Sequence, residues 1–532
     1  SFRYGYDNLN RMNVQYLYVD GNSTGHSTRY MYVPGAAGGT TGLVSGIYFL
    51  KGLYEDNGNL TYTYDDVGNI TTIKENGVLK ATYHYDQFGQ LVREDNAWMG
   101  KTYLYIYDAG GNITQCREAL YTTGDVLTYT GGGSTYSYAT GTETDGSPVW
   151  KDLLTSYKGN TITYDAIGNP LNWGTDISDM HWNNGRRLTY LQKRTNMISY
   201  AYDETGLRTE KSTNTNRTYF DRDTSGNLVH EFRDYSGYLG EDSHLYYYYD
   251  ANGSIGSISY NGVRYAFRKN LQGDVIAILD TSGNVVARYT YDAWGRILSI
   301  TDGNGNANTS STFIGNVNPI RYRGYYYDTE TGWYYLNSRY YDPEVKRFLN
   351  SDMIAGEIGS LGYNLFSYCK NDPVNRIDSE GALSWWASEQ MIHGVQRQPG
   401  GGYNPAYLGA APADSCVETV PDKLDLFVFT GTHSSYTLET VKTTTHTVSS
   451  QEAAEIASES AGMQAINDLI STAPITATAS IILGEFVVVK SIVSFVGTAV
   501  GIATTYSQAK KNNIHVDSGT YHTIVAIYIY SN

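Results

Sequence analysis

Thiol chemistry is the first possibility that the sequence offers, because Cys416 is followed in the same region by His433 and His446. A histidine beside a cysteine can act as the base that generates a nucleophilic thiolate. Spacing alone is weak support for such a site, and a buried thiol near surface histidines is the simpler explanation. We favour that explanation and assign no thiol chemistry to this region.

Other catalytic and metal-binding signatures are missing from residues 382–532. The region has no His-x-Glu followed by Pro-Cys-x-x-Cys, no His-Glu-x-x-His and no Gly-x-Ser-x-Gly. The three cysteines of the chain, Cys116, Cys369 and Cys416, lie far apart and fit neither a disulfide framework nor a zinc site. We therefore predict no metal and no cofactor.

The charge of the chain argues against nucleic acid as its main partner. The formal net charge is −16 at pH 7, and residues 382–532 contain six Lys and Arg against twelve Asp and Glu. Phosphate contacts need clustered cations, which this balance does not supply. We expect no nucleic-acid partner, although the negative charge of residues 382–532 disfavours a nuclease without excluding one.

The composition favours an all-β repeat protein. The 532 residues include 52 Tyr and 56 Gly but only 11 Pro. This is too aromatic for a disordered chain and too rich in turn residues for a helical one. A chain of this length also exceeds one ordinary core, so a repeat array is expected.

A repeated unit of the form Tyr-Asp-x-x-Gly-x-Ile/Leu organises the first part of the chain. Copies begin at Tyr64, Tyr85 and Tyr107, with steps of 21 and 22 residues. Aspartate accepts hydrogen bonds from amides just ahead of it, and glycine supplies the positive φ that closes the turn. Each unit is therefore predicted as strand, turn and strand. Further copies begin at Tyr164, Tyr202, Tyr249 and Tyr291.

Single hairpins of this size are marginal in water, so neighbouring units must pair edge to edge into a spiralling antiparallel sheet. Tyrosine suits such a wall because its ring is apolar while its hydroxyl can face water. Residues 130–145 are rich in Gly, Thr and Ser and are predicted as loops or degenerate repeats. Residues 270–289 again follow the pattern strand, turn, strand.

Residues 321–343 are the most strongly patterned stretch, with aromatic and polar residues alternating between Asp-x-x-x-Gly and Asp-Pro turns. This pattern is typical of a tight β-hairpin with a large aromatic face. The stretch closely resembles the core that ends the repeat region of RHS/YD-repeat proteins, which include polymorphic toxins and the C components of Tc toxin complexes. The resemblance covers residues 1–381 and implies a β-shell.

The same resemblance suggests chemistry at the end of the core. RHS proteins end there with Pro-x-x-x-x-Asp-Pro-x-Gly-Leu, and Pro373, Asp378 and Gly381 match this motif. Ser379 and Ala382 depart from it. The family implies aspartyl autoproteolysis, in which one carboxylate activates water and the other is protonated. By position we assign Asp352 and Asp378 to these roles.

Arg347 is assigned as the charge partner of this pair, and the bond cut would lie just after Ala382 or Leu383. A purely structural alternative stays open. Aspartate in Asp-x-x-Gly forms turns, and Asp352 can cap the segment that follows it.

After residue 381 the composition changes, since only seven tyrosines remain. We predict repeats over 1–263, a core domain over 264–381 and a small α+β domain over 382–532. Strands are expected at 424–429 and 520–530, and a helix at 450–470. The apolar run 475–506, with Glu485 and Lys490 as its only charges, is predicted either as a membrane-inserting helical hairpin or as a buried helix.

The resemblance implies that residues 382–532 are the effector of a polymorphic toxin used in interbacterial competition. It also implies a cognate immunity protein, a delivery or secretion apparatus, and a secreted or cell-surface location. The effector is expected to act on membranes or to be an unrecognised enzyme. The alternative is a cell-surface or wall-associated YD protein that binds glycans or partners. Because Ser1 opens inside a repeat-like unit without an export signal, we expect a longer natural protein.

Overall fold

A computed structural model of the chain divides into two compact units. The first contains residues 1–352 and 364–409, and the second contains residues 353–363 and 410–532. The structure describes residues 2–9, 11–19, 22–35, 40–51, 55–141, 149–237, 240–250, 253–352, 364–381, 385–386, 423–432, 435–445, 480–481 and 521–529.

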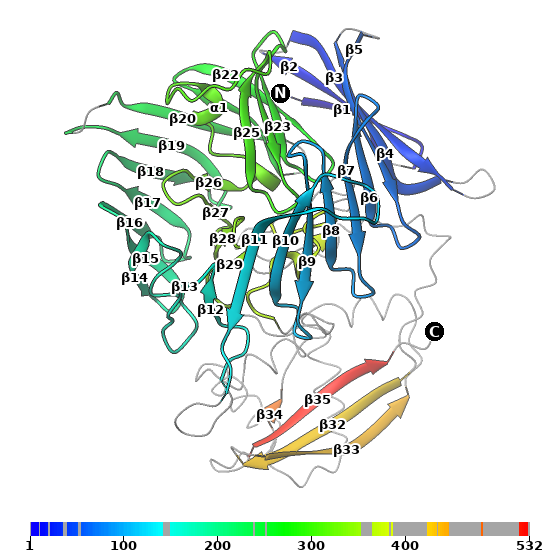
Figure 1. Ribbon diagram of the computed structural model, residues 1–532, viewed down its shortest axis with the longest axis vertical. Coiled ribbons are helices and arrows are strands. Elements are labelled where there is room, and N and C mark those ends of the chain that lie inside the picture. Colours follow the sequence, from blue (N-terminus) through cyan, green and yellow to red (C-terminus); the bar gives the residue numbers. More distant parts are fainter. Residues whose placement is uncertain are drawn as a thin grey trace. The chain divides into compact units, whose positions relative to one another are not determined.

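Two long antiparallel sheets form most of the first unit, and in each the strands pair in the order of the sequence (Figure 1). Among the described residues the first sheet has 13 strands. They are β1 (Phe2–Tyr6), β2 (Met12–Val19), β3 (Asn22–Pro34), β4 (Thr40–Lys51), β5 (Glu55–Tyr64), β6 (Ile70–Glu75), β7 (Val78–Tyr85), β8 (Leu91–Asn96), β9 (Lys101–Tyr107), β10 (Ile113–Leu120), β11 (Tyr129–Tyr138), β12 (Leu154–Tyr157) and β13 (Asn160–Thr161).

The second sheet has 12 strands in the described part of the chain. They are β14 (Ile177–Asn183), β15 (Arg187–Lys193), β16 (Asn196–Tyr202), β17 (Arg208–Ser212), β18 (Arg217–Arg222), β19 (Leu228–Asp234), β20 (Ser243–Tyr249), β21 (Ile255–Tyr260), β22 (Val263–Lys269), β23 (Val275–Leu279), β24 (Val285–Tyr291) and β25 (Ile297–Asp302). The division predicted between residues 263 and 264 falls within β22, inside this sheet. The predicted class, an antiparallel hairpin-repeat shell, is confirmed.

The turn between β5 and β6 shows how one repeat closes. The Asp65 carboxylate accepts hydrogen bonds from the amides of Val67 and Asn69, at 3.1 and 2.8 Å. Gly68 has a φ of 92°, which only glycine adopts without strain. The predicted turn chemistry is therefore confirmed. The bond from the amide four residues on recurs at Asp86, Asp108, Asp165, Asp203, Asp223, Asp250, Asp280, Asp292 and Asp302.

The tyrosine of each repeat binds the repeat before it. The Tyr85 hydroxyl donates to the Ile70 carbonyl at 2.7 Å, and Tyr107 donates to Leu91 at 2.6 Å. The tyrosine hydroxyl, which we noted can face water, is used in these residues to satisfy a carbonyl of an earlier strand. The same bond is made by Tyr32, Tyr64, Tyr138, Tyr164, Tyr202, Tyr249 and Tyr291.

A small core of irregular chain and short strands lies between the two sheets (Figure 1). It contains α1 (Ile314–Val317), the 3₁₀ turns η2 (Tyr322–Gly324) and η3 (Cys369–Asn371), the meander β26 (Tyr326–Asp328), β27 (Trp333–Tyr335), β28 (Tyr340–Asp342) and β29 (Arg347–Phe348), and the pair β30 (Arg376–Ile377) and β31 (Trp385–Trp386). The aromatic hairpin predicted over residues 321–343 is thus the first part of a four-stranded meander whose tyrosines are almost all buried.

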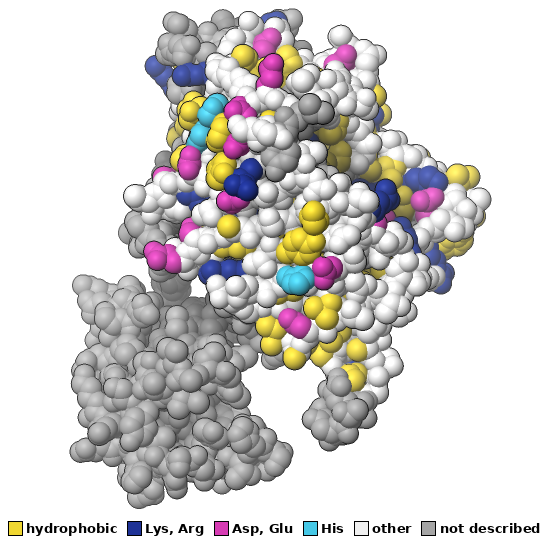
Figure 2. Space-filling model, turned by 90° about the vertical axis from the view of Figure 1, so that its left-hand side faces the viewer, with side chains coloured by type: hydrophobic (Ala, Val, Ile, Leu, Met, Phe, Trp, Pro, Cys, Tyr) yellow, Lys and Arg dark blue, Asp and Glu magenta, His cyan; other side chains and the backbone are white. Residues whose placement is uncertain are grey.

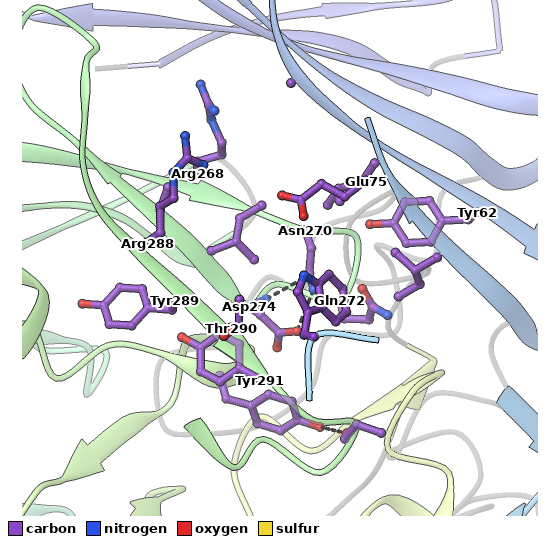
Figure 3. A pocket seen from close by; sticks show the side chains of 18 of the residues that line it. Tyr62, Glu75, Arg268, Asn270, Gln272, Asp274, Arg288, Tyr289, Thr290 and Tyr291 are labelled. Atoms are coloured by element: carbon purple, nitrogen blue, oxygen red, sulfur yellow. Dashed lines mark hydrogen bonds between the residues drawn. The ribbon is translucent and has the colours of Figure 1, made fainter. Parts of the chain in front are cut away.

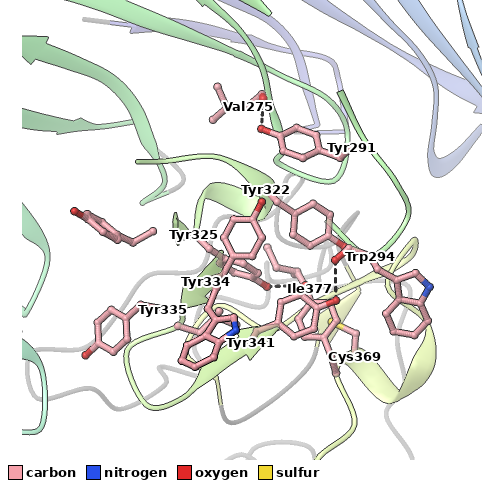
Figure 4. Packing of buried hydrophobic residues seen from close by; sticks show 14 of the residues in the cluster. Val275, Tyr291, Trp294, Tyr322, Tyr325, Tyr334, Tyr335, Tyr341, Cys369 and Ile377 are labelled. Atoms are coloured by element: carbon pink, nitrogen blue, oxygen red, sulfur yellow. Dashed lines mark hydrogen bonds between the residues drawn. The ribbon is translucent and has the colours of Figure 1, made fainter. Parts of the chain in front are cut away.

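The core is tied to the last predicted repeat of the second sheet. The hydroxyls of Tyr322, Tyr341 and Tyr334 donate to the carbonyls of residues 293, 294 and 295 in turn, at 2.9, 2.7 and 2.8 Å. Figure 4 shows the bond between Tyr341 and Trp294. A Cβ at Gly295 would lie 2.5 Å from the Tyr322 ring, so this turn requires glycine. Three tyrosines of the core therefore donate hydrogen bonds to three successive carbonyls of this repeat.

The second unit contains a sheet in the order β33-β32-β35-β34. Strands β32 (Lys423–Thr432) and β35 (Tyr521–Ile529) match the two strands predicted there, and β33 (Ser435–Thr445) adds a third. The helix predicted at 450–470 lies outside the described residues. Within the apolar run 475–506 only β34 (Ser480–Ile481) is described, and it is a strand paired in parallel with β35. The helices that the structure does describe are all too short to cross a bilayer.

Candidate functional site

The two aspartates assigned from the sequence lie together at the end of the core. Asp352 follows β29, and its backbone amide donates to the Leu365 carbonyl at 2.8 Å. Asp378 follows β30, and its amide donates to the Tyr325 hydroxyl at 3.0 Å. The two aspartates lie 26 residues apart in sequence, and each is positioned by a hydrogen bond of its own backbone amide.

A single guanidinium joins the two carboxylates. Nη2 of Arg339 lies 2.7 Å from Oδ2 of Asp352 and 3.7 Å from Oδ2 of Asp378. The side chains of Asp352 and Asp378 are 12% and 3% exposed, so the pair is nearly removed from water. A cation between two buried carboxylates offsets the repulsion that would otherwise separate them.

The remaining nitrogens of Arg339 hold the backbone around this pair. Nη1 donates to the Leu365 carbonyl at 2.9 Å, and Nε donates to the Gly381 carbonyl. The guanidinium also lies 3.6 Å from the centre of the Phe348 ring, which fixes its plane. Arg339 thus connects both aspartates to the last residue of the predicted core.

The chain between Asp378 and Gly381 is a clamped turn. Oδ1 of Asp378 accepts the Gly381 amide at 2.8 Å, and the Ser338 hydroxyl donates to the Glu380 carbonyl at 2.6 Å. Gly381 has a φ of 75°, and a Cβ there would lie 2.8 Å from Oγ of Ser338. Only glycine fits this position without strain.

Arg347, which we assigned as the charge partner, is directed elsewhere. It donates to the Asp152 carbonyl at 2.7 Å, and its guanidinium lies over the rings of Tyr138 and Phe366 at 5.3 and 4.8 Å. Arg339 occupies the place that we had expected for Arg347. Arg339 is separated from Asp352 by 13 residues and from Asp378 by 39, so no local sequence pattern connects the three.

Neither thiol chemistry nor metal binding gains support from the described residues. Burial and the nearby charge of Asp378 raise the pKa of the Cys369 thiol well above its usual value, which makes it a poor nucleophile. Cys416, His433 and His446 lie outside the described part of the chain. Within the described part, His, Cys, Asp and Glu form no group of three or more suited to a metal ion.

Curated relatives match only through part of their length. The tRNA3(Ser)-specific nuclease WapA of Bacillus spizizenii is 33% identical over 287 residues, which is 52% of this chain and 12% of that protein. Double-stranded DNA deaminase toxin A of Burkholderia cenocepacia is 34% identical over 110 residues, which is 21% of this chain and 7% of that protein. The chain therefore spans a small fraction of the length of these relatives.

The fold has a counterpart among solved structures. The crystal structure of TcdB2-TccC3 superimposes on 71% of this chain and 21% of that one, with a TM-score of 0.53 and 22% sequence identity. The Teneurin YD-shell family matches residues 55–374, which include strands of both long sheets and most of the core. The resemblance predicted from the tyrosine-aspartate repeats is confirmed, and the chain belongs to the Teneurin YD-shell family.

Proposed function

We propose that residues 1–381 form a shell that carries residues 382–532 as an effector for use against competing bacteria. The relatives support this division of labour, because a tRNA nuclease and a DNA deaminase toxin share similarity with the same chain while bearing different named activities. A common carrier with a variable cargo explains that combination. The protein would be secreted or held at the cell surface, with an immunity protein in the producer and an apparatus for delivery.

The effector would be released by self-cleavage after Ala382 or Leu383. The observation that carries this proposal is the contact of one Arg339 nitrogen with both Asp352 and Asp378, beside the clamped Gly381. The closer and more exposed carboxylate, that of Asp352, is suited to stay ionised and act as base. The more buried Asp378, with its longer contact to the cation, is suited to carry the proton.

The cleavage consumes one water and one peptide bond. Asp352 takes a proton from water as the hydroxide adds to the scissile carbonyl carbon, while Asp378 donates a hydrogen bond to the carbonyl oxygen. The C–N bond then breaks, and the leaving amine takes the proton held by Asp352. Asp352 is then ionised again, and Asp378 has kept its proton throughout, so both carboxyls are in their starting states.

Intact mass measurement of the purified chain tests this mechanism. We expect two fragments that sum to the full chain plus one water for the native protein, and a single full-length species for Asp352→Asn and Asp378→Asn. Asparagine keeps the Oδ1 that accepts the Gly381 amide, so the turn is retained. Asp280→Asn is the matched control, because Asp280 forms a turn with amide bonds of 2.9 and 2.8 Å but contacts no Arg339.

Two results would reject self-cleavage. One is a single full-length species for the native chain after prolonged incubation. The other is cleavage of Asp378→Asn at the native rate, with a thermal melting profile that matches the native one. Either result would leave Asp378 as a turn residue and Arg339 as a structural clamp.

The effector would act either by disrupting membranes or as an enzyme, and the two actions can be told apart by experiment. The apolar run 475–506 supports membrane disruption, which full-length protein would report as dye release from anionic lipid vesicles. A catalytic effector would leave the vesicles intact. The expectation of no nucleic-acid partner gains no support from the relatives, since one is named a tRNA nuclease. Incubation with total tRNA, followed by electrophoresis, therefore belongs beside the vesicle assay.

A glycan-binding surface protein is the second candidate, and one feature of the second sheet favours it. Phe232 stacks on His244 at 4.7 Å and His230 stacks on Tyr246 at 4.5 Å, across strands β19 and β20. His244 and Tyr246 are exposed, so the stack forms a flat aromatic platform. On the face drawn in Figure 2 charged groups of both signs are interspersed, which disfavours polyanion binding. Retention on immobilised glycans, lost in Tyr246→Ala, would support this function.

A further inference from the structure

A cavity of about 600 Å³ lies between the two sheets and the core. Its walls come from β4 to β7 of the first sheet, β22 to β24 of the second, and η2 (Figure 3). Tyrosine and other aromatic rings make up much of the lining. Polar and charged side chains line the cavity beside these rings. A cavity of this size that combines aromatic rings with convergent polar groups is typical of sites for small molecules.

Two arginine side chains lie on one wall of this cavity. Arg268 of β22 pairs with Ala277 of β23, and Ala277 pairs with Arg288 of β24. Residues directly opposite each other in antiparallel strands share a face, so both guanidiniums flank one small alanine. Figure 3 shows the two side chains reaching into the same space. Arg268 is buried, and its guanidinium lies 4.3 Å from the centre of the Phe49 ring.

Other polar groups line the cavity too, and they include the carboxyl of Asp292 as well as those of Asp274 and Glu75. Arg323 is already paired with Asp274 at 2.7 Å. Glu75 faces the cavity from the opposite wall (Figure 3), so it would compete with a bound anion for the cations. Gln272 is buried, and its Oε1 has no hydrogen-bond partner among the described residues. A buried acceptor of this kind is costly unless a donor reaches it.

We propose that this cavity binds a small organic anion with an aromatic or apolar body, its carboxylate, phosphate or sulfonate held by Arg268 and Arg288. The tyrosine walls bury the body of the ligand, and an N–H or O–H of the ligand donates to Oε1 of Gln272. Burial and the neighbouring Arg288 lower the pKa of Arg268 to about 10, so a bound anion would relieve an unfavourable pair of like charges. The proposal is independent of self-cleavage and of the nature of the effector.

A pair of fluorescent probes tests the proposal with the full chain. 8-Anilinonaphthalene-1-sulfonate has an aromatic body, one N–H and a sulfonate, whereas N-phenyl-1-naphthylamine has the same body and N–H without the charge. We expect the sulfonate to bind at one site per chain, and Arg288→Gln to weaken it at least about tenfold, as expected for loss of a charge-assisted contact. The neutral probe should change by less than about twofold in the same variant.

Two further variants test whether the sulfonate binds inside the cavity. Glu75→Gln removes the competing carboxylate and should tighten the sulfonate about threefold or more. Arg264→Gln is the matched control, because Arg264 is an exposed arginine of β22, the strand that carries Arg268, and its loss should leave binding unchanged. Thermal melting confirms that each variant is folded. Equal weakening by Arg264→Gln and Arg288→Gln, no response to Arg288→Gln, or equal loss of the neutral probe would overturn the proposal.

Discussion

At the scale of single residues, the interior of the shell holds carboxyls that water cannot reach. Oε1 of Glu94 accepts the Ala293 amide at 2.9 Å, which joins β8 of the first sheet to the last predicted repeat of the second. Oε2 accepts the Tyr105 hydroxyl at 3.0 Å. Burial, with the nearby charge of Asp292, raises the pKa of Glu94 to about 7. The folded chain is therefore more stable when Glu94 is protonated than when it is ionised.

The elevated pKa of Glu94 predicts a loss of stability as pH rises. Glu94 binds its proton more tightly in the folded chain than in the unfolded one, where the pKa is near 4.5. The free energy of unfolding is then highest below that value and falls until about pH 7. Glu94→Gln does not titrate, so the difference in unfolding free energy between native and variant should change by on the order of 3 kcal/mol between pH 4 and pH 8. Denaturant unfolding at both pH values measures this difference. An equal difference between native and variant at pH 4 and at pH 8 would contradict the prediction.

The two aspartates of the candidate site could be predicted from the sequence, whereas their arginine partner could not. Asp352 and Asp378 were placed by a family resemblance, and the structure brings them to one nitrogen atom. Their partner Arg339 could not be predicted, because its position depends on the packing of the core meander against β30. Arg347 lies only five residues before Asp352, but its guanidinium donates to the Asp152 carbonyl instead, so nearness in sequence was a poor guide.

At the scale of elements, the repeat depends on the repeat before it. The turn can be read from the sequence because aspartate, glycine and the amides that they arrange lie within five residues. The tyrosine bond cannot, since its acceptor carbonyl lies 15 residues earlier for Tyr85 and Ile70 and depends on strand register. A repeat is therefore complete only when its predecessor is in place, as in other linear repeat arrays.

Removal of one such hydroxyl measures this dependence. Tyr85→Phe keeps the ring but leaves the Ile70 carbonyl without its donor, so we expect a loss of about 1–2 kcal/mol in unfolding free energy. Tyr246→Phe is the control, because its side chain is 44% exposed on the outer face of the second sheet. Denaturant unfolding followed by circular dichroism gives both values. Equal stabilities for the two variants would show that the hydroxyl contributes nothing.

At the scale of the whole shell, the sequence predicted a continuous wall of hairpins, and the wall exists. Its division into two sheets was not predicted. The division lies at residues 162–176, where only isolated bridges such as Tyr164 to Pro170 and Trp173 to Ile177 are formed. The core closes this gap, because Nε1 of Trp173 and Nε1 of Trp333 donate to the same Oδ2 of Asp342, at 2.7 and 3.1 Å. Such a contact depends on the finished fold.

A buried group of charges also ties the core to the second sheet. Arg208 of β17 makes two bonds to the Asp328 carboxylate, at 2.6 and 3.2 Å, and Lys211 adds a third at 2.9 Å. All three side chains are at most 6% exposed. Removal of one member of a buried charged group leaves the others desolvated without full compensation, which typically costs about 3–5 kcal/mol.

Asp328→Asn is therefore the substitution that tests whether core and sheets form one cooperative structure. If they do, the variant should unfold in a single transition, with the free energy lowered by about 3–5 kcal/mol, and tryptophan fluorescence and circular dichroism should report the same midpoint. Asp221→Asn is the control, since the Asp221 side chain is 67% exposed and pairs only at the surface with His230, so its loss should cost less than about 1 kcal/mol. Two separate transitions in Asp328→Asn, with the first sheet unchanged, would instead mean that each sheet is stable alone and that the core serves the second sheet only.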